Sequence, residues 1–158
     1  MEQGGHPQEQ LLALELDEEA CQCIVESTFL AGCELVEQTD STNDDCLAAF
    51  RSGQIKQHPW LFVANHQRRG RGRSGNSWWS AAGALTFSIS ISLEDPANQS
   101  LLSLLSAVAC CDALEKVAGC PQLEIKWPND IYCQGRKLAG ILIESPAVGE
   151  MLVLGIGI

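Results

Sequence analysis

The clearest pattern along the chain is a strict alternation of apolar and polar residues over positions 85–93. Leucine, phenylalanine and isoleucine hold the odd positions from Leu85 to Leu93, while threonine and serine hold the even positions. A period of two is typical of a β-strand with one buried face. The pattern therefore predicts a strand of an antiparallel sheet, with its apolar face on the core.

Other apolar runs of strand length predict the rest of a sheet. They lie at residues 34–38, 60–65, 123–127, 130–133, 138–144 and 151–158. Gln134 and Gly135 separate two of these runs and predict a hairpin turn. Pro128 and Asn129 interrupt another pair, and we expect this interruption to turn polar groups into a cleft.

Two segments carry helix signals. The sequence from Ser41 to Asp45 places a hydroxyl residue three positions before an acid, twice over, which predicts a capped helix start. This helix is expected to end near Arg51, before Gly53. Residues 101–118 predict a longer helix whose first three turns carry no charge, so we expect it to be largely buried. Residues 11–30 predict one or two short helical pieces.

Composition excludes several classes of protein. A length of 158 residues is that of one domain, and 10 basic against 20 acidic residues give a net charge of −10. This charge argues against non-specific binding to nucleic acid or to an anionic membrane. No run approaches the ~18 apolar residues of a membrane span. Residues 1–10 predict a disordered tail without signal-peptide features, so a cytoplasmic location is expected, with all eight cysteines reduced.

The basic residues are concentrated in two segments, which hold seven of the ten. The first is the sequence QRRGRGRSGNSWWS at 67–80, and the second is the stretch 126–137. In an acidic protein this concentration points to a small anionic ligand. Gly70, Gly72 and Gly75 predict a loop whose backbone approaches that ligand, with arginines as phosphate donors. An RNA-binding segment and a merely solvated loop stay open as alternatives.

Two lysines of the second segment stand beside apolar strands. Lys126 ends the run LEIK, and it must reach a partner because a buried unpaired ammonium is costly. Lys137 leads into the strand at 138–144, in which Gly140 allows a flat ligand to lie against the backbone. An ordinary surface charge is the alternative for each lysine.

Five motifs then occur in one order along the chain. They are STN at 41–43, Gln67 before GRGRSG at 70–75 with Trp78 and Ser80, KWPNDI at 126–131, KLAGILIE at 137–144 and LGIGI at 154–158. In this combination the chain resembles the biotin protein ligases, also called biotin–acetyl-CoA-carboxylase ligases, over residues 35–158. The resemblance implies an α+β fold related to class II aminoacyl-tRNA synthetases, with a mixed, mainly antiparallel sheet flanked by helices.

The resemblance also implies a two-step reaction that uses biotin, ATP and Mg²⁺. The biotin carboxylate attacks the α-phosphate of ATP to give biotinyl-5′-AMP and pyrophosphate. The acyl group then passes to a lysine of the biotin carboxyl carrier domain of a carboxylase. Mg²⁺ is expected on the triphosphate, held mostly by phosphate and water, with no protein ligand assigned. A homodimer stays open, and neither DNA nor a membrane is an expected partner.

The site residues implied by the family form a neutral group and a charged group. The uncharged ureido ring of biotin needs neutral donors and acceptors. These are supplied by Ser41, Thr42, Asn43, Gln67 and the backbone of Gly70 and Arg71. Lys137 is assigned the catalytic bridging of carboxylate and α-phosphate, and Arg73 with Arg71 is expected to clamp the same anions. Further ligand contacts are expected from Gly72, Lys126, Asn129, Gly140 and Ile141. Trp78 is either a lid over the ligand or a core residue.

The chain also departs from the family pattern. Asn76 stands where the family usually has an arginine, so one phosphate contact is expected to be missing. The family continues after LGIGI into further strands and a small C-terminal barrel. Residues 11–158 are therefore expected to be an incomplete catalytic domain, without an N-terminal DNA-binding domain, and the strand at 151–158 is expected to have an exposed edge.

Two other functions stay open at this point. One is a lipoate or octanoyl ligase or transferase of the same superfamily. The other is a biotin-binding fragment without catalysis.

Overall fold

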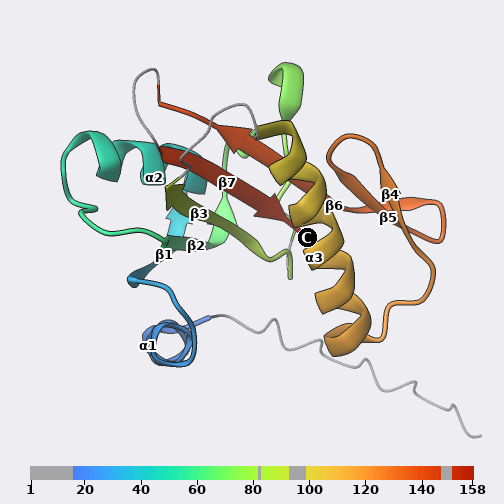
Figure 1. Cartoon of the computed structure of the whole chain (residues 1–158), viewed down its shortest axis with the longest axis horizontal. Coiled ribbons are helices and arrows are strands. Elements are labelled where there is room, and N and C mark those ends of the chain that lie inside the picture. The colour runs from blue at the N-terminus through green and yellow to red at the C-terminus, as the bar shows by residue number, and fades with distance from the viewer. Residues whose placement is uncertain (1–15, 82, 93–98, 147–150) are drawn as a thin grey trace, which may run out of the picture.

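In the described part of the chain, seven strands form one sheet and three helices pack against it (Figure 1). The computed structural model describes residues 16–81, 83–92, 99–146 and 151–158, so the predicted tail at 1–10 and Leu93 lie outside the described residues. The strands are β1 (Gly32–Thr39), β2 (Trp60–Gln67), β3 (Thr86–Ser92), β4 (Leu123–Lys126), β5 (Asp130–Cys133), β6 (Arg136–Glu144) and β7 (Met151–Gly157). The helices are α1 (Glu18–Ser27), α2 (Thr42–Arg51) and α3 (Gln99–Ala118).

The sheet is mixed but mainly antiparallel, as predicted. Its strand order is β1-β2-β3-β7-β6-β5-β4. Only the β1–β2 pair is parallel among the described ladders, and the other pairs are antiparallel. The strands β4, β5 and β6 form a meander, and its β5–β6 hairpin turns at Gln134 and Gly135 as predicted. The α+β class is therefore confirmed.

Strand β7 lies at the centre of this sheet rather than at its edge. It forms antiparallel ladders with β3 on one side and with β6 on the other. All seven of its residues are buried. The expectation that this strand has an exposed edge is therefore wrong, because β7 inserts between strands that precede it in sequence. The absence of polar side chains from β7 fits a strand that is covered on both faces.

The pairing register defines the two faces of the sheet. Ser88 of β3 lies opposite Gly155 of β7, and Phe87 lies opposite Ile156. Because side chains alternate between faces, the first pair belongs to one face and the second pair to the other. Helix α2 covers the first face through a cluster that includes Cys46, Leu47, Phe62, Met151 and Val153. Helix α3 covers the second face through a cluster that includes Ala107, Ile131, Ala139, Ile141, Leu154 and Ile156.

The alternating strand is confirmed as β3, but its two faces are buried in the opposite sense to the prediction. Thr86, Ser88 and Ser90 are at most 1% exposed, whereas Phe87 and Ile89 are only partly buried. The polar face is turned toward α2, which supplies hydrogen-bond partners for Ser88, while Thr86 bonds to the Ala64 carbonyl of β2 and Ser90 to His58 and the Trp60 backbone. Buried hydroxyls with partners are acceptable in a core. The alternation thus identifies the two faces without revealing which one is better covered.

Helix α3 is confirmed near its predicted bounds, but it is not largely buried. Leu101, Leu105 and Val108 are 52%, 55% and 44% exposed, whereas Ala107 is fully buried against the sheet. In the first turns of α3, uncharged residues occur on every side of the helix, but only one side faces β4, β5 and β6. Lack of charge is therefore a poor guide to burial here. None of the helices within the described ranges has the length and apolar character needed to cross a membrane.

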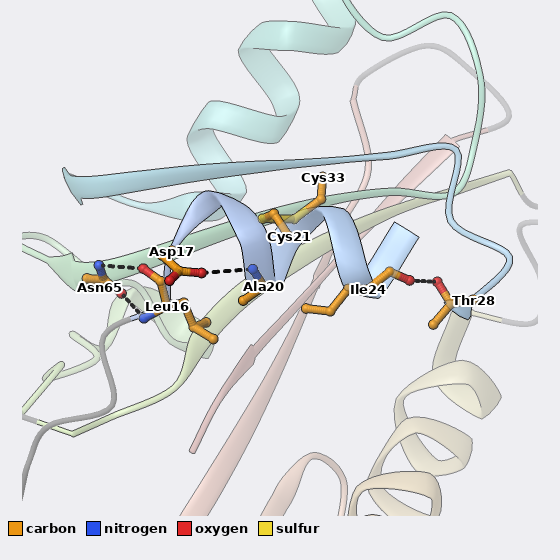
Figure 2. The surroundings of a disulfide bond; sticks show 8 residues. All are labelled: Leu16, Asp17, Ala20, Cys21, Ile24, Thr28, Cys33 and Asn65. Carbon is orange, nitrogen blue, oxygen red and sulfur yellow. Dashed lines mark hydrogen bonds between the residues drawn. A yellow bond between two sulfur atoms is a disulfide. The ribbon is translucent and has the colours of Figure 1, made fainter. Parts of the chain in front are cut away.

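Helix α1 confirms a helical piece within 11–30, and it is fastened to β1 and β2 (Figure 2). Cys21 of α1 and Cys33 of β1 form a disulfide, with their Cα atoms 5.6 Å apart. The expectation that all cysteines are reduced is wrong for this pair. Asn65 of β2 holds the segment before the helix, because its side-chain amide bonds to the backbone N–H and C=O of Leu16, both at 3.3 Å.

Candidate active site

A cavity of about 170 Å³ opens on the side of the sheet that carries α2. Its walls come from the start of α2, the end of β2, the loop that follows β2, and parts of β3, β5, β6 and β7. The lining residues are Ser41, Thr42, Asn43, Gln67, Arg71, Gly72, Arg73, Asn76, Ser77, Trp78, Phe87, Asn129, Asp130, Lys137, Gly140, Ile141, Leu142, Gly155, Ile156 and Gly157. The fold thus brings residues of all five sequence motifs to one place.

One side of this cavity is formed by Ser41, Thr42, Asn43 and Gln67, and we call these residues, together with Ser88, which bonds to two of them without lining the cavity itself, the neutral wall. These residues are at most 8% exposed. The Ser88 hydroxyl lies 2.7 Å from the Thr42 hydroxyl and 2.5 Å from Asn43 Oδ1. Gln67 Oε1 accepts from the Thr42 backbone N–H and hydroxyl at 2.8 and 3.0 Å. Thr42, Asn43, Gln67 and Ser88 thus form a connected network of uncharged groups, which fixes their positions before a ligand arrives.

Helix α2 begins at Thr42 as predicted, but its first turn is not capped as predicted. Ser41 holds the N-cap position without a capping hydrogen bond from its side chain. Gln67 reaches across from β2 instead and accepts the Thr42 N–H, which satisfies one of the free amides of the first helical turn. The Ser41 side chain lines the cavity. A residue that the local pattern assigns to capping therefore belongs to the site.

Glycines form the floor of the cavity beneath Trp78 and Asn43. Gly140 of β6 lies opposite Gly157 of β7, and a Cβ atom at either position would press on the Trp78 indole. A Cβ atom at Gly155 would overlap the Asn43 side-chain amide. These glycines are required for close packing rather than for an unusual backbone conformation. Trp78 therefore lines the cavity, whereas its neighbour Trp79 is 85% exposed.

Arg71 connects the loop after β2 to two other elements through its guanidinium. Its Nη1 and Nη2 donate to the two Glu144 oxygens, both at 2.8 Å, and Nη2 also donates to Asp44 Oδ1 at 2.6 Å. Burial by itself would lower the pKa of Arg71, but the hydrogen bonds and charges of Glu144 and Asp44 raise that pKa above its ordinary value. Arg71 therefore stays a cation whose charge is already matched by protein carboxylates.

Arg73 also lines the cavity, but no carboxylate balances its charge in the described part of the chain. Its Nη1 donates to Asn129 Oδ1 at 3.3 Å. Asn129 is held firmly by two hydrogen bonds of 2.9 Å to Ile141. Its side-chain Nδ2 donates to the Ile141 carbonyl, and its backbone carbonyl accepts the Ile141 N–H. Arg73 thus offers an uncompensated cation beside a rigid amide.

Lys137 lies across the same cavity from the loop, and its ammonium has two partners. Nζ is 2.8 Å from Asp130 Oδ1 and 5.7 Å from the centre of the Trp78 ring. The Lys137 side chain is 42% exposed, so this ion pair is open to water and to a competing anion. We call Arg71, Arg73 and Lys137 the charged rim. The rim and the neutral wall border one cavity.

Most of the residues implied by the family meet at this cavity, including Lys137 and Arg73. Gly70 does not line it, but its carbonyl accepts the Trp78 N–H at 2.7 Å and so helps to shape the loop. Lys126 does not line it either. Its side chain is exposed, with Nζ 5.2 Å from the Tyr132 ring centre, so the expectation of a buried ammonium in search of a partner is wrong. The roles assigned to individual residues stay predictions.

Sequence reasoning missed two residues that organise the site. Ser88 belongs to the neutral wall, and its only sequence signal is its place on the polar face of an alternating strand. Glu144 bonds to both Asn43 and Arg71, and its only signal is an acid at the end of an otherwise apolar strand. Both signals are ordinary for surface residues, so tertiary contacts alone reveal these positions.

The arrangement is suited to a ligand with a neutral polar head and an anionic end. The neutral wall can hydrogen-bond the head without an uncompensated charge. The charged rim can neutralise anions that approach one another, which is the main requirement for joining a carboxylate to a phosphate.

Comparison with known proteins gives a consistent result. The model of the family described as "Biotin/lipoate A/B protein ligase family" matches residues 35–158. The chain is 38% identical over 130 residues to a biotin–[acetyl-CoA-carboxylase] ligase of Mycobacterium tuberculosis, covering 79% of this chain and 48% of the relative. It is 41% identical over 124 residues to the bifunctional ligase/repressor BirA of Escherichia coli, covering 75% and 37%. The chain thus spans about half the length of these relatives, or less.

Solved structures resemble the fold as well. The biotin protein ligase from Aquifex aeolicus, in complex with biotin and ATP, matches with a TM-score of 0.68 and 32% identity, over 82% of this chain and 52% of that chain. The biotin protein ligase from Leishmania major, in complex with biotin, matches with a TM-score of 0.69 and 27% identity, over 80% and 55%.

Proposed function

The chain belongs to the biotin/lipoate A/B protein ligase family, and from this we propose that it forms the biotin-binding and adenylate-forming part of a biotin protein ligase. The observation that carries the proposal is the junction of the neutral wall and the charged rim in one cavity. The wall suits the uncharged ureido ring of biotin. The rim suits the biotin carboxylate and the phosphates of ATP.

In the proposed first step, a biotin carboxylate oxygen attacks the α-phosphorus of ATP. A new bond forms between that oxygen and phosphorus, the bond to the bridging oxygen breaks, and pyrophosphate leaves with its electron pair. Two anions must approach during this step, so cations that face both lower its barrier. Arg73 supplies such a charge directly, because no described carboxylate pairs with it.

Lys137 is proposed to change partners during the same step. Its ion pair with Asp130 is short, but the Lys137 side chain is 42% exposed, and an ion pair that water can reach has a small net stability. Phosphate and carboxylate oxygens can therefore draw the ammonium away from Asp130. In the second step a lysine amine of the carrier domain attacks the acyl carbon of biotinyl-5′-AMP, releases AMP and loses a proton to form the amide.

Mg²⁺ and the protein partner complete the proposal. Among the described residues no group of three or more His, Cys, Asp or Glu side chains is arranged to hold a metal ion. We propose that Mg²⁺ arrives with ATP and is held by phosphate oxygens and water. The proposed partner is the biotin carboxyl carrier domain of a carboxylase, in the cytoplasm and without DNA. The homodimer left open by the sequence is tested by sedimentation of the purified chain.

The proposal is tested by ATP–pyrophosphate exchange, with calorimetric titration of biotin beforehand. Exchange that depends on biotin, followed by transfer of labelled biotin to a carrier domain, is the expected result. Biotin binding without exchange would identify a passive binding module instead. Lipoate added as a competitor separates the two ligand classes of the family, because the proposal requires biotin to bind more tightly than lipoate. Absence of both binding and exchange would end the proposal.

A further inference from the structure

Glu144, the last residue of β6, joins the neutral wall to the loop that follows β2. Its Oε2 accepts Asn43 Nδ2 at 2.7 Å, and its two oxygens accept both terminal nitrogens of Arg71 at 2.8 Å. Glu144 is not among the residues that line the cavity, and its side chain is 23% exposed. One carboxylate therefore holds a residue of the wall and a residue of the loop at the same time.

The charge of Glu144 also determines how the Asn43 amide is oriented. Asn43 Nδ2 donates to Glu144, while Asn43 Oδ1 lies 2.5 Å from the Ser88 hydroxyl. Rotation of the amide by half a turn would place Oδ1 against the Glu144 carboxylate, and two acceptors repel each other. A neutral amide at position 144 would accept either orientation. The negative charge of Glu144, supported by the Leu142 carbonyl 3.5 Å from Asn43 Nδ2, therefore specifies which Asn43 atom is presented to each neighbour.

The loop end of this connection is a small hairpin at 70–78. Arg71 and Ser77 form an isolated β-bridge, the Gly72 N–H donates to the Asn76 carbonyl at 2.8 Å, and the Trp78 N–H donates to Gly70. These bonds lie within the hairpin, so they do not attach it to the rest of the protein. The Arg71 guanidinium supplies an attachment to β6 through Glu144 and to α2 through Asp44.

We propose that Glu144 is a positioning residue that couples the orientation of Asn43 in the neutral wall to the closed position of loop 70–78. For the identity of the ligand, biotin, the inference rests on the proposed function. A ligand that hydrogen-bonds to Asn43 strengthens the chain Asn43–Glu144–Arg71, because each bond in a connected network polarises the next. Binding at the wall thereby holds the loop that carries Arg73.

Asp44 provides a matched control within the chain. It also pairs with Arg71, at 2.6 Å, and its side chain is 53% exposed. Among the hydrogen bonds of the described residues, Asp44 accepts from Arg71 and has none to Asn43. Asp44→Asn therefore removes one of the negative charges that pair with Arg71 and leaves the wall unchanged. Glu144→Gln disturbs both the pairing of Arg71 and the hydrogen bond to Asn43.

The first measurement is limited trypsin digestion without ligand. Trypsin cleaves after arginine and lysine, so cleavage after Arg71 and Arg73 reports opening of the loop, and cleavage after Lys116, within α3, reports unfolding of regular structure. Glu144→Gln should speed loop cleavage by about tenfold and Asp44→Asn by less than about twofold. Asn43→Ala should also speed loop cleavage, but it should add nothing in the Glu144→Gln background. Equal rates in the two carboxylate variants, or a full additional effect of Asn43→Ala, would overturn the coupling.

The second measurement adds biotin to the same variants. Biotin should slow loop cleavage in the wild type and in Asp44→Asn but not in Glu144→Gln, whose Kd for biotin should rise about tenfold. Unchanged protection in Glu144→Gln would also refute the coupling. If the wild type fails to bind biotin, the proposed function fails, while the ligand-free digestion still decides the role of Glu144.

Discussion

The neutral wall and the charged rim border the same cavity but are built in opposite ways. Wall residues are at most 8% exposed, and hydrogen bonds join Thr42, Asn43, Gln67 and Ser88 to one another. At the rim, the Arg71 and Lys137 side chains are 39% and 42% exposed; Arg71 is held by Glu144 and Asp44, whereas Lys137 has the single carboxylate partner Asp130, which a ligand anion can replace. Uncharged groups can be buried with fixed partners, whereas a fully buried cation would need a permanent counter-charge. Groups that recognise a ligand through fixed hydrogen bonds therefore need a buried environment, whereas a cation that changes partners needs one that is partly open to water.

Removal of a rim charge should have the largest effect. Lys137→Ala should lower biotin-dependent ATP–pyrophosphate exchange by about 10²- to 10³-fold, because the developing charge at phosphorus loses a cation. The fold should persist, since the Lys137 side chain is 42% exposed, with a small decrease in melting temperature because the buried Asp130 Oδ1 loses its ion pair. Lys116→Ala on α3, also exposed, is the matched control. Exchange at the wild-type rate in Lys137→Ala would remove this lysine from the mechanism.

Disruption of the neutral wall should weaken binding and stability together. Gly155→Ala places a methyl group on the Asn43 amide, so we expect biotin binding about 10- to 100-fold weaker and a loss of about 1–3 kcal/mol in the free energy of unfolding. Calorimetry and denaturant titration measure the two effects.

Gly72→Ala is the control for stability in that experiment. A Cβ atom there would meet its nearest neighbour, the Asn76 carbonyl oxygen, at 3.5 Å, which is an ordinary contact. Its melting temperature should match the wild type. A Gly155→Ala protein with normal biotin affinity would contradict the rigidity of the wall.

The two regions also differ in how far the sequence predicts them. The rim is visible in the sequence because arginines among glycines are unusual in an acidic chain, and Lys137 belongs to a compact motif. Part of the wall is not visible, because Ser88 is one of several serines on an alternating strand. Its burial depends on α2 packing over that face, which is a tertiary contact. Ser41 and Gln67 illustrate the same point. The local pattern assigns the cap of α2 to Ser41, but the Thr42 N–H is bound by Gln67 of β2.

The fold shows the same division between local and long-range information. The periodicity of β3 and the bounds of α2 follow from neighbouring residues, and both are confirmed. The central position of β7 and the exposed side of α3 depend on which strands pair and on what a helix faces. Patterns along the chain carry little information about these choices. The failed predictions for β3, β7 and α3 all converted a local pattern into a statement about burial or sheet edges.

Ionic strength should separate the two regions without any mutation. An increase from about 0.05 to about 0.5 M salt shortens the screening length by roughly threefold, which weakens interactions between exposed charges. ATP binding should weaken by about tenfold, whereas binding of biotinamide, an uncharged analogue, should change by less than about twofold. Calorimetric titrations at the two salt concentrations measure both. Equal salt dependence for the two ligands would show that charge contributes to the wall as well.

The smallest expected effect concerns the continuation of the neutral face beyond the wall. Ser90 lies two residues from Ser88 on the same face of β3, and its hydroxyl is 2.9 Å from His58 Nδ1. Burial lowers the pKa of His58 below its ordinary value. Below about pH 6.5 the unfolded chain therefore binds a proton at this position more readily than the folded chain does, and stability falls as the pH decreases.

His58→Gln removes this titration while keeping a polar side chain at the position. Between about pH 7.5 and about pH 5.5, the melting temperature of the wild type should fall by up to about 2 °C more than that of His58→Gln. Thermal unfolding of both proteins in matched buffers measures the difference. Parallel pH profiles would mean that protonated His58 is as well accommodated as the neutral form, and that the preference for uncharged groups on this face ends at the cavity.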